Sequence, residues 1–408
     1  MKTGKLGLPI SSVESGSPSF NNFMAEELSI VRQAIDKIPY VVSLKHSLNR
    51  DPRVSALEGK MICNGSGASR FSLENLVMWW VWRANRVGVE VAKKNLEDFL
   101  VNEKIDINEV LWIYGAAPEE VLRLTGDVRL VPLKDMPDSR EKKQAMDAQF
   151  GLFPTSGIGF SAALVASRKV DKIYPSDLVC CEFEKSFFKK FHEISFMLNI
   201  IGGICCAAGF QTGYVSDETP FGPFGGSGGS LPVYDVLPKM GTSHVSHESA
   251  LHFSKLFEKF QNLPSNWKER VLSSSRRLAQ AKSRIDLNDK ALDLGIALEM
   301  VLLHSEHNKA ELPGQLSNHF RLRGTWLAGN DYVERKQYFD SLGRIYSQRS
   351  QVAHNGILAP LKGPEHNQLH EQIAEHIEVA EIIIQKLIIS GPPVSWTNLV
   401  LGETLIEN

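Results

Sequence analysis

The side chains of this sequence best suited to chemistry are an arginine and a histidine five positions apart, Arg349 and His354. Histidine exchanges protons near neutral pH because its ordinary pKa lies there. Arginine keeps its charge and offers a planar fork of donors to phosphate oxygens. Together they could let an RNA 2′-hydroxyl attack the neighbouring phosphate, with His354 moving a proton and Arg349 stabilising the charge on the phosphorus oxygens. The pair therefore predicts RNA cleavage without a metal.

The spacing limits how one chain could use this pair. On an ideal helix five residues correspond to about 500°, so the two side chains would point roughly 140° apart. Asn355 and Gly356 predict that the helix ends just after His354. That position loosens the angular limit, and the helix dipole there favours the charged imidazole. A two-fold dimer would help further, because it could bring two copies of this helix together into one composite cleft.

An arginine followed by a histidine at this spacing is a weak signal alone, since about one match is expected by chance in a chain of this size. The surrounding residues make it more specific. Tyr346 precedes the arginine, Ser350 follows it, and Gly356 comes two residues after the histidine. Two further blocks lie upstream: Asp293-Leu-Gly-Ile-Ala-Leu-Glu299 and the stretch Leu316–Arg335, which ends in Glu-Arg.

With these blocks, the region from Trp267 to Ile389 resembles the HEPN superfamily, specifically its Apea-like branch of prokaryotic defence proteins. The resemblance implies a dimeric helical-bundle ribonuclease that needs no metal or cofactor and leaves a cyclic phosphate. Arg349 and His354 match the catalytic pair of that family. The sequence His354-Asn-Gly departs from the commoner His-Gly and adds one residue to the helix end.

The resemblance also implies a biological setting. The first part of the chain would hold the nuclease in check until a phage-derived trigger arrives, and the nuclease would then cleave host or phage RNA, with tRNA as a candidate. A competing hypothesis is a non-catalytic HEPN-like module that binds RNA, a nucleotide or a partner protein.

Three residues are candidates for supporting this pair. Glu299 lies in an otherwise apolar segment, where an unpaired charge is costly to bury. It is expected either to orient Arg349 or His354 or to pair with a structural arginine. Tyr346 lies one turn before Arg349, and core packing is its expected role. Ser350 is expected to contact RNA or to be solvated.

A basic run in the segment Trp267–Ile285 is the candidate RNA-binding surface. These side chains could form a solvated helix face, or they could bind successive phosphates of an RNA backbone. The run consists of Lys268, Arg270, Arg276, Arg277, Lys282 and Arg284.

Two further motifs are better explained by structural roles than by metal binding or base stacking. The spacing of His247-Glu248 and His252 is one residue too long for the zinc-protease helix, so no metal site is expected there. Trp79, Trp80 and Trp82 could stack on bases, but an aromatic cluster beside Leu and Val favours core packing.

The pattern after His244 predicts successive helices typical of a bundle. The expected helices are Ser249–Phe260, Trp267–Ile285, Lys290–His304, Leu316–Leu327, Tyr332–Ala353 and His370–Ile389. Gly391-Pro392-Pro393 marks the end of the last one. We expect the tail, Val394–Asn408, to form a strand or an interaction arm.

The first half predicts mixed α and β structure. Helices are expected at Met24–Ile38, Leu73–Val91 and Glu119–Leu124, and strands at Val128–Leu133, Gly157–Ala166 and Leu178–Phe183. The fold class is therefore α+β, a mixed α/β domain followed by an all-α bundle of the HEPN type. Its expected parts are a flexible arm (1–22), a sensing domain (23–240) that ends in a Gly/Pro-rich loop (217–232), the helical nuclease (245–391) and a tail (392–408).

Composition and charge limit the binding partners and the cellular compartment that we expect for this chain. The formal net charge of -2 gives no global attraction to nucleic acid, so an RNA-binding surface must be a local basic patch. The five cysteines include two adjacent pairs and form no Cys-x-x-Cys, which argues against a disulfide framework and a thiolate zinc site. With no apolar leader and no apolar stretch long enough for a bilayer, we expect a cytoplasmic protein with no membrane partner.

Overall fold

The structure is a computed structural model that describes residues 30–33, 35, 37–65, 68–136, 142, 160–174, 181–216, 218–220, 242–303, 313–358 and 364–402. The expected arm at 1–22, most of the expected helix at 24–38 and most of the Gly/Pro-rich loop at 217–232 lie outside these residues. The chain combines α and β structure, and its C-terminal region is helical.

The chain divides into two compact units. The first contains Met1–Trp112, Asp127–Phe188 and Gly209–Pro232, and the second contains Ile113–Gly126, Lys189–Ala208 and Val233–Asn408. A single cut near residue 240 therefore does not describe the division, because two earlier segments belong to the helical unit.

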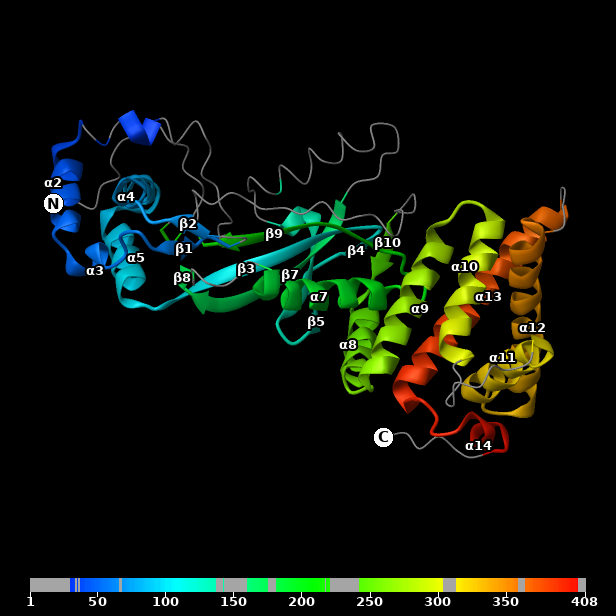
Figure 1. Cartoon of the computed structure of the whole chain (residues 1–408). Helices are drawn as coiled ribbons and strands as arrows, with labels where there is room; N and C mark the ends of the chain where they lie inside the picture. The colour runs from blue at the N-terminus through cyan, green and yellow to red at the C-terminus, as the bar shows by residue number, and fades with distance from the viewer. Residues whose placement is uncertain are drawn as a thin grey trace. The chain divides into compact units, whose positions relative to one another are not determined.

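Helices α2 to α5 and a small sheet lie in the N-terminal part of the first unit (Figure 1). The helices are α2 (Pro39–Asn49), α3 (Pro52–Ser55), α4 (Leu73–Val87) and α5 (Val89–Val101). Helix α4 begins where the Ser72 hydroxyl accepts a hydrogen bond from the Asn75 N–H, and Gly88, at φ 94°, makes the turn into α5. The antiparallel sheet has the order β2-β1-β8, from β1 (Met61–Cys63), β2 (Ala68–Arg70) and β8 (Ile173–Tyr174).

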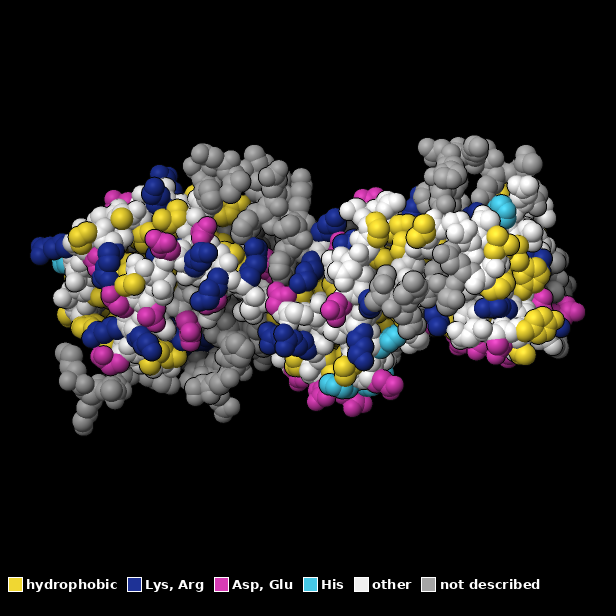
Figure 2. Space-filling model, turned by 90° about the horizontal axis from the view of Figure 1, so that it is seen from below, with side chains coloured by type: hydrophobic (Ala, Val, Ile, Leu, Met, Phe, Trp, Pro, Cys, Tyr) yellow, Lys and Arg dark blue, Asp and Glu magenta, His cyan; other side chains and the backbone are white. Residues whose placement is uncertain are grey.

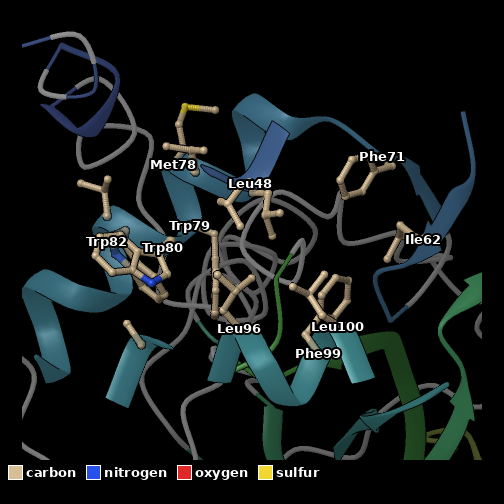
Figure 3. Packing of buried hydrophobic residues seen from close by; sticks show 14 of the residues in the cluster. Leu48, Ile62, Phe71, Met78, Trp79, Trp80, Trp82, Leu96, Phe99 and Leu100 are labelled. Carbon is tan, nitrogen blue, oxygen red and sulfur yellow. The ribbon is translucent and has the colours of Figure 1, made fainter. Parts of the chain in front are cut away.

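The tryptophans of α4 form the centre of the core of this unit. Trp79, Trp80 and Trp82 are all fully buried, at 0% exposure. Figure 3 shows them in one cluster with Leu96 and Phe99 of α5. Their burial confirms the prediction of core packing, because fully buried rings leave no face for a nucleotide base.

A five-stranded sheet has the order β5-β6-β7-β3-β9. Its strands are β3 (Lys104–Tyr114), β5 (Leu122–Thr125), β6 (Val128–Pro132), β7 (Phe160–Asp171) and β9 (Ala207–Val215). Strands β6 and β7 pair antiparallel, with Arg129 opposite Val165. Strands β6 and β7 thus confirm that the segments predicted at 128–133 and 157–166 contain strands.

Two predictions for this region were wrong. The segment predicted as a short helix at 119–124 contains β5, whose side chains alternate between buried and more exposed with the period of a strand. The segment predicted as a strand at 178–183 runs into helix α7 (Cys181–Leu198). Phe187, Phe191 and Ile194 recur there at helical spacing, a pattern visible only over a longer window.

The second unit is built on helices α8 to α14. They span α8 (His247–Gln261), α9 (Ser265–Ser283), α10 (Leu287–Leu302), α11 (Pro313–Ala328), α12 (Tyr332–Asn355), α13 (Pro364–Ser390) and α14 (Trp396–Val400). The first six confirm the six predicted helices. Helix α10 packs against α9, α12 and α13, and α11 packs against α12 (Figure 1). The parallel pair β4 (Ala116–Pro118) and β10 (Ser243–Val245) completes the unit.

Side-chain caps explain where several of these helices begin. The Ser246 hydroxyl accepts from the Ser249 N–H, Asp286 accepts from the N–H groups of Asn288 and Asp289, and Asp331 accepts from the Glu334 N–H. Of the two alternatives for the tail, the strand is wrong at residues 396–400, where Ser395 caps the short helix α14. Residues 403–408 lie outside the described part. Among the helices that the structure describes, none is both long and apolar enough to cross a membrane.

Candidate functional site

Arg349 lies where α12 crosses α10. Gly295 and Glu299 stand one turn apart on α10 and face it. The stem of Arg349 presses against the backbone at Gly295, so closely that a methyl group there would overlap its Cβ and Cγ atoms. One turn further along, Arg349 Nη2 donates to Glu299 Oε2 over 2.7 Å. The glycine therefore provides the space, and the glutamate fixes the guanidinium.

The Arg349–Glu299 pair is half-buried, with side-chain exposures of 27% and 19%. Burial raises the pKa of the Glu299 carboxyl, and the adjacent Arg349 charge opposes that rise. Arg349 Nε is buried and has no hydrogen-bond partner among the described residues. Glu299 therefore pairs with Arg349, an arrangement that fits both an orienting role and a structural ion pair.

His354 lies on the last turn of α12, and its side chain is exposed. The helix ends at Asn355, and Gly356 follows in the left-handed conformation at φ 77°, where its N–H donates to the Val352 carbonyl over 2.8 Å. The extra residue of His354-Asn-Gly is therefore accommodated within the helix.

A small apolar core holds this helix end in place. The Leu358 N–H donates to Asn288 Oδ1 on the first turn of α10 over 2.7 Å. Leu358 and Val352 are buried together with Leu287, Ala291 and Ile373. The position of His354 is consequently fixed by its neighbours on α12 and α10.

The structure does not bring Arg349 and His354 onto one stripe of the helix. Helix α12 is regular through both residues, so the side chains point roughly 140° apart. Arg349 faces α10, whereas His354 faces solvent. One chain alone therefore presents the two groups in different directions.

Tyr346 and Ser350 lie on either side of Arg349 on α12. The Tyr346 ring is half-buried, and its centroid lies 5.4 Å from that of Phe320 on α11, a contact that fits the expected packing role. Ser350 is also half-buried. Neighbouring Gln348 donates to Gln372 of α13 over 2.8 Å, so α12 is held on two further sides.

The basic run on α9 does not form one RNA-facing surface, and Lys282 requires a correction. This side chain is buried, and its ammonium donates to the carbonyls of Asn199 and Ile204 over 2.6 and 2.7 Å and pairs with Glu381 of α13. Burial raises the pKa of the Glu381 carboxyl, and the Lys282 charge opposes this. Lys282 therefore stabilises the fold and does not reach RNA.

The other members of the run divide into two groups. Arg277 and Arg284 both pair with Asp293 of α10, at 2.8 and 3.2 Å. Arg276 is exposed, while Lys268 and Arg270 are half-buried, and Arg270 lies over the Trp267 ring at 5.9 Å. Only part of the predicted track is thus available on the surface.

The histidines near the start of α8 have no metal-binding arrangement within the part of the chain that the structure describes, where no group of three or more His, Cys, Asp or Glu side chains could hold an ion. His252 instead lies 3.0 Å from the Gln385 side-chain oxygen. Sequence reasoning missed the role of Gly295, although it is part of the block Asp293–Glu299 that carried the resemblance.

Comparison with known proteins gave no match to a family model, a curated protein or a solved structure.

Proposed function

We propose that the helical region 245–391 is a metal-independent endoribonuclease domain of the HEPN type that acts as a homodimer on RNA. The observation that carries the proposal is the fixed arginine of α12. Gly295 and Glu299 hold Arg349 in one place, and exposed His354 ends the same helix. The resemblance to the HEPN superfamily gives these two residues their roles.

The chemistry follows from the two side chains. Neutral His354 takes the proton of an RNA 2′-hydroxyl, whose oxygen attacks the adjacent phosphorus. Arg349 stabilises the negative charge that builds on the phosphorus oxygens. The bond to the 5′-oxygen breaks, and that oxygen receives a proton from the imidazolium. The products are a 2′,3′-cyclic phosphate and a 5′-hydroxyl, so no proton is gained or lost overall.

The angle between the two side chains supports a site made by two subunits. Arg349 of one copy and His354 of the other can face one phosphate only if the ends of two α12 helices meet. The first unit would then sense a phage-derived trigger and restrain the nuclease, with tRNA as a candidate target and the cytoplasm as the place of action. These last points come from the resemblance.

A second candidate function is binding of RNA or a partner protein without cleavage. The observation that favours it is that Arg349 is already paired with Glu299, while His354 points elsewhere. Ion pairs of this kind also occur in purely structural roles.

One assay separates the two functions. Purified full-length chain is incubated with total RNA in excess EDTA beside Arg349→Ala and His354→Ala, with Arg344→Ala and His370→Ala as controls on α12 and α13. Cleavage that survives EDTA, is lost in the first two variants and is kept in the controls supports the nuclease. RNA binding without cleavage by the wild-type chain supports the second function.

A further inference from the structure

Two arginines at the contact of α11 and α12 lie flat on aromatic rings. The guanidinium carbon of Arg321 lies 3.7 Å from the centroid of the Phe339 ring, and that of Arg335 lies 3.8 Å from the Trp326 ring. All four side chains are half-buried. A guanidinium stacked in this way loses little further freedom when it binds a ligand.

The hydrogen bonds of these arginines leave much of each guanidinium available. Arg321 Nε donates to the Phe339 carbonyl over 3.3 Å, and Arg335 Nε donates to the Gly329 carbonyl over 3.1 Å. Neither has a carboxylate partner within the described residues. They differ in this from Arg277 and Arg284, whose charges are balanced by Asp293.

The residues at this contact follow one face of α12. Arg335, Phe339, Gly343, Tyr346 and Ser350 recur at intervals of three or four residues. Gly343 leaves room for the Arg321 side chain, since a methyl group there would lie 3.0 Å from Arg321 Nε. The face ends beside Arg349, about 15 Å along the helix axis from Phe339.

Local charge also favours an anionic ligand. Helix α11 contains no Asp or Glu. Glu334 on α12 is engaged with the backbone N–H and the side chain of Asn330. Tyr332 is 77% exposed at the start of α12, where its ring is free to stack on a base. Figure 2 shows hydrophobic side chains over the part of the view where α11 to α14 lie in Figure 1, with Lys and Arg as well as Asp and Glu side chains among them.

We propose that Arg321 and Arg335 bind backbone phosphates of single-stranded RNA and guide the strand along α12 toward Arg349. The direction of this track rests on the proposed function, because it assumes that Arg349 marks the place of cleavage. Stacked arginines and an exposed aromatic ring suit single strands, whose phosphates and bases are both accessible. This surface lies on α11 and α12, apart from the basic run on α9 that the sequence predicted to bind RNA.

The test measures binding separately from cleavage. Full-length His354→Ala is titrated with a fluorescent single-stranded RNA of about 20 nucleotides over a range of salt concentrations. Adding Arg321→Gln and Arg335→Gln should weaken binding about tenfold or more and lower the slope of log affinity against log salt by about 1.4, since each phosphate contact contributes about 0.7. Arg344→Gln with Lys94→Gln, which removes two charges at exposed positions, is the matched control and should leave the slope unchanged.

A second variant covers the case in which the double substitution unfolds the chain. Arg335→Gln alone leaves the Arg321 stack in place and should lower the slope by about 0.7. Unchanged affinity and slope in whichever of these variants remains folded would overturn the proposal.

The experiments distinguish an error in the proposed RNA-binding role of Arg321 and Arg335 from an error in the proposed nuclease function. If the wild-type chain cleaves RNA and the Arg321/Arg335 variant binds and cleaves equally well, the track is wrong and the nuclease stands. If binding depends on these arginines and no cleavage occurs, the track stands and the nuclease is wrong.

Discussion

The backbone of Gly295 on α10 lies directly against the aliphatic stem of Arg349 on α12, with no room for even a methyl group between them. A helix-interior glycine costs about 0.5–1 kcal/mol relative to alanine, so its presence needs a reason. Here the reason is the close approach that lets Arg349 reach Glu299 one turn further along.

Replacing this glycine should therefore affect the site more than the fold. Gly295→Ala forces Arg349 out of place and should reduce RNA cleavage to nearly the level of Arg349→Ala. The overpacking should cost about 1–3 kcal/mol of unfolding free energy. Activity in EDTA and urea denaturation measure the two effects.

Gly324→Ala is the matched control for that substitution. Its methyl group would meet terminal side-chain atoms, such as Leu342 Cδ1 at 2.7 Å, and it does not touch Arg349. It should destabilise the protein by a similar amount but keep the cleavage activity of the folded fraction. Equal loss of activity in both glycine variants would contradict a positioning role for Gly295.

The two-subunit site can be tested by mixing inactive chains. When Arg349→Ala and His354→Ala chains are co-expressed and associate at random, half of the dimers contain one chain of each kind. Such a dimer has one intact composite site where the wild-type dimer has two, so the total activity should return to about one quarter of wild type. Differently tagged chains allow the mixed dimer to be purified. A purified mixed dimer with no activity would show that both groups must come from one chain.

The buried pair of Lys282 and Glu381 predicts a large effect on stability. Lys282→Met leaves the Glu381 carboxylate buried without its partner, along with two backbone carbonyls that lose their donor. The expected loss is about 3–5 kcal/mol of unfolding free energy, and Lys282→Met with Glu381→Leu should recover much of it. Arg276→Met, an exposed position on the same helix, should change stability little, and denaturant titration compares the three.

The burial of Lys282 could have been inferred in part from the sequence. Val271, Leu278 and Lys282 recur at helical spacing, and the first two are fully buried. A lysine in that register was a sign of an inward-facing charge, but its position within a run of basic residues favoured the surface interpretation. The carboxylate that makes burial tolerable lies about one hundred residues away in sequence, on α13.

Helices α8 to α13 of the second unit could be predicted because caps and apolar spacing agree over long segments. The short β5 and the start of α7 could not, because a few residues fit either period. The direction of Arg349 was also beyond the sequence, since it depends on contact with Gly295 and Glu299 across two helices.

His376 on α13 predicts how the helical unit responds to acid. Its side chain is 1% exposed, and neither ring nitrogen has a hydrogen-bond partner within the described part of the chain. Burial and then the nearby Arg344 charge lower its pKa from 6.5 to about 4. Because the unfolded chain takes up a proton in this range and the folded chain does not, stability falls as the pH drops from about 6.5 to about 4.

The loss attributable to His376 should reach up to about 3 kcal/mol over that range, and His376→Leu should remove it. The measurement is the unfolding free energy of both proteins at several pH values. His370→Gln, an exposed position on the same helix, is the control and should follow wild type. Identical pH profiles for wild type and His376→Leu would mean that the imidazole is not buried in its neutral form.

The chemistry itself is tested most directly by an RNA oligonucleotide that the protein cuts at one site, compared in excess EDTA with the same oligonucleotide carrying a single 2′-deoxy sugar at that site. If Arg349 and His354 promote attack by the 2′-hydroxyl, the all-RNA substrate is cut to a 2′,3′-cyclic phosphate and a 5′-hydroxyl, and the deoxy-substituted substrate stays intact. Cleavage of the deoxy-substituted substrate at the same site, or cleavage that requires added metal, would contradict this mechanism.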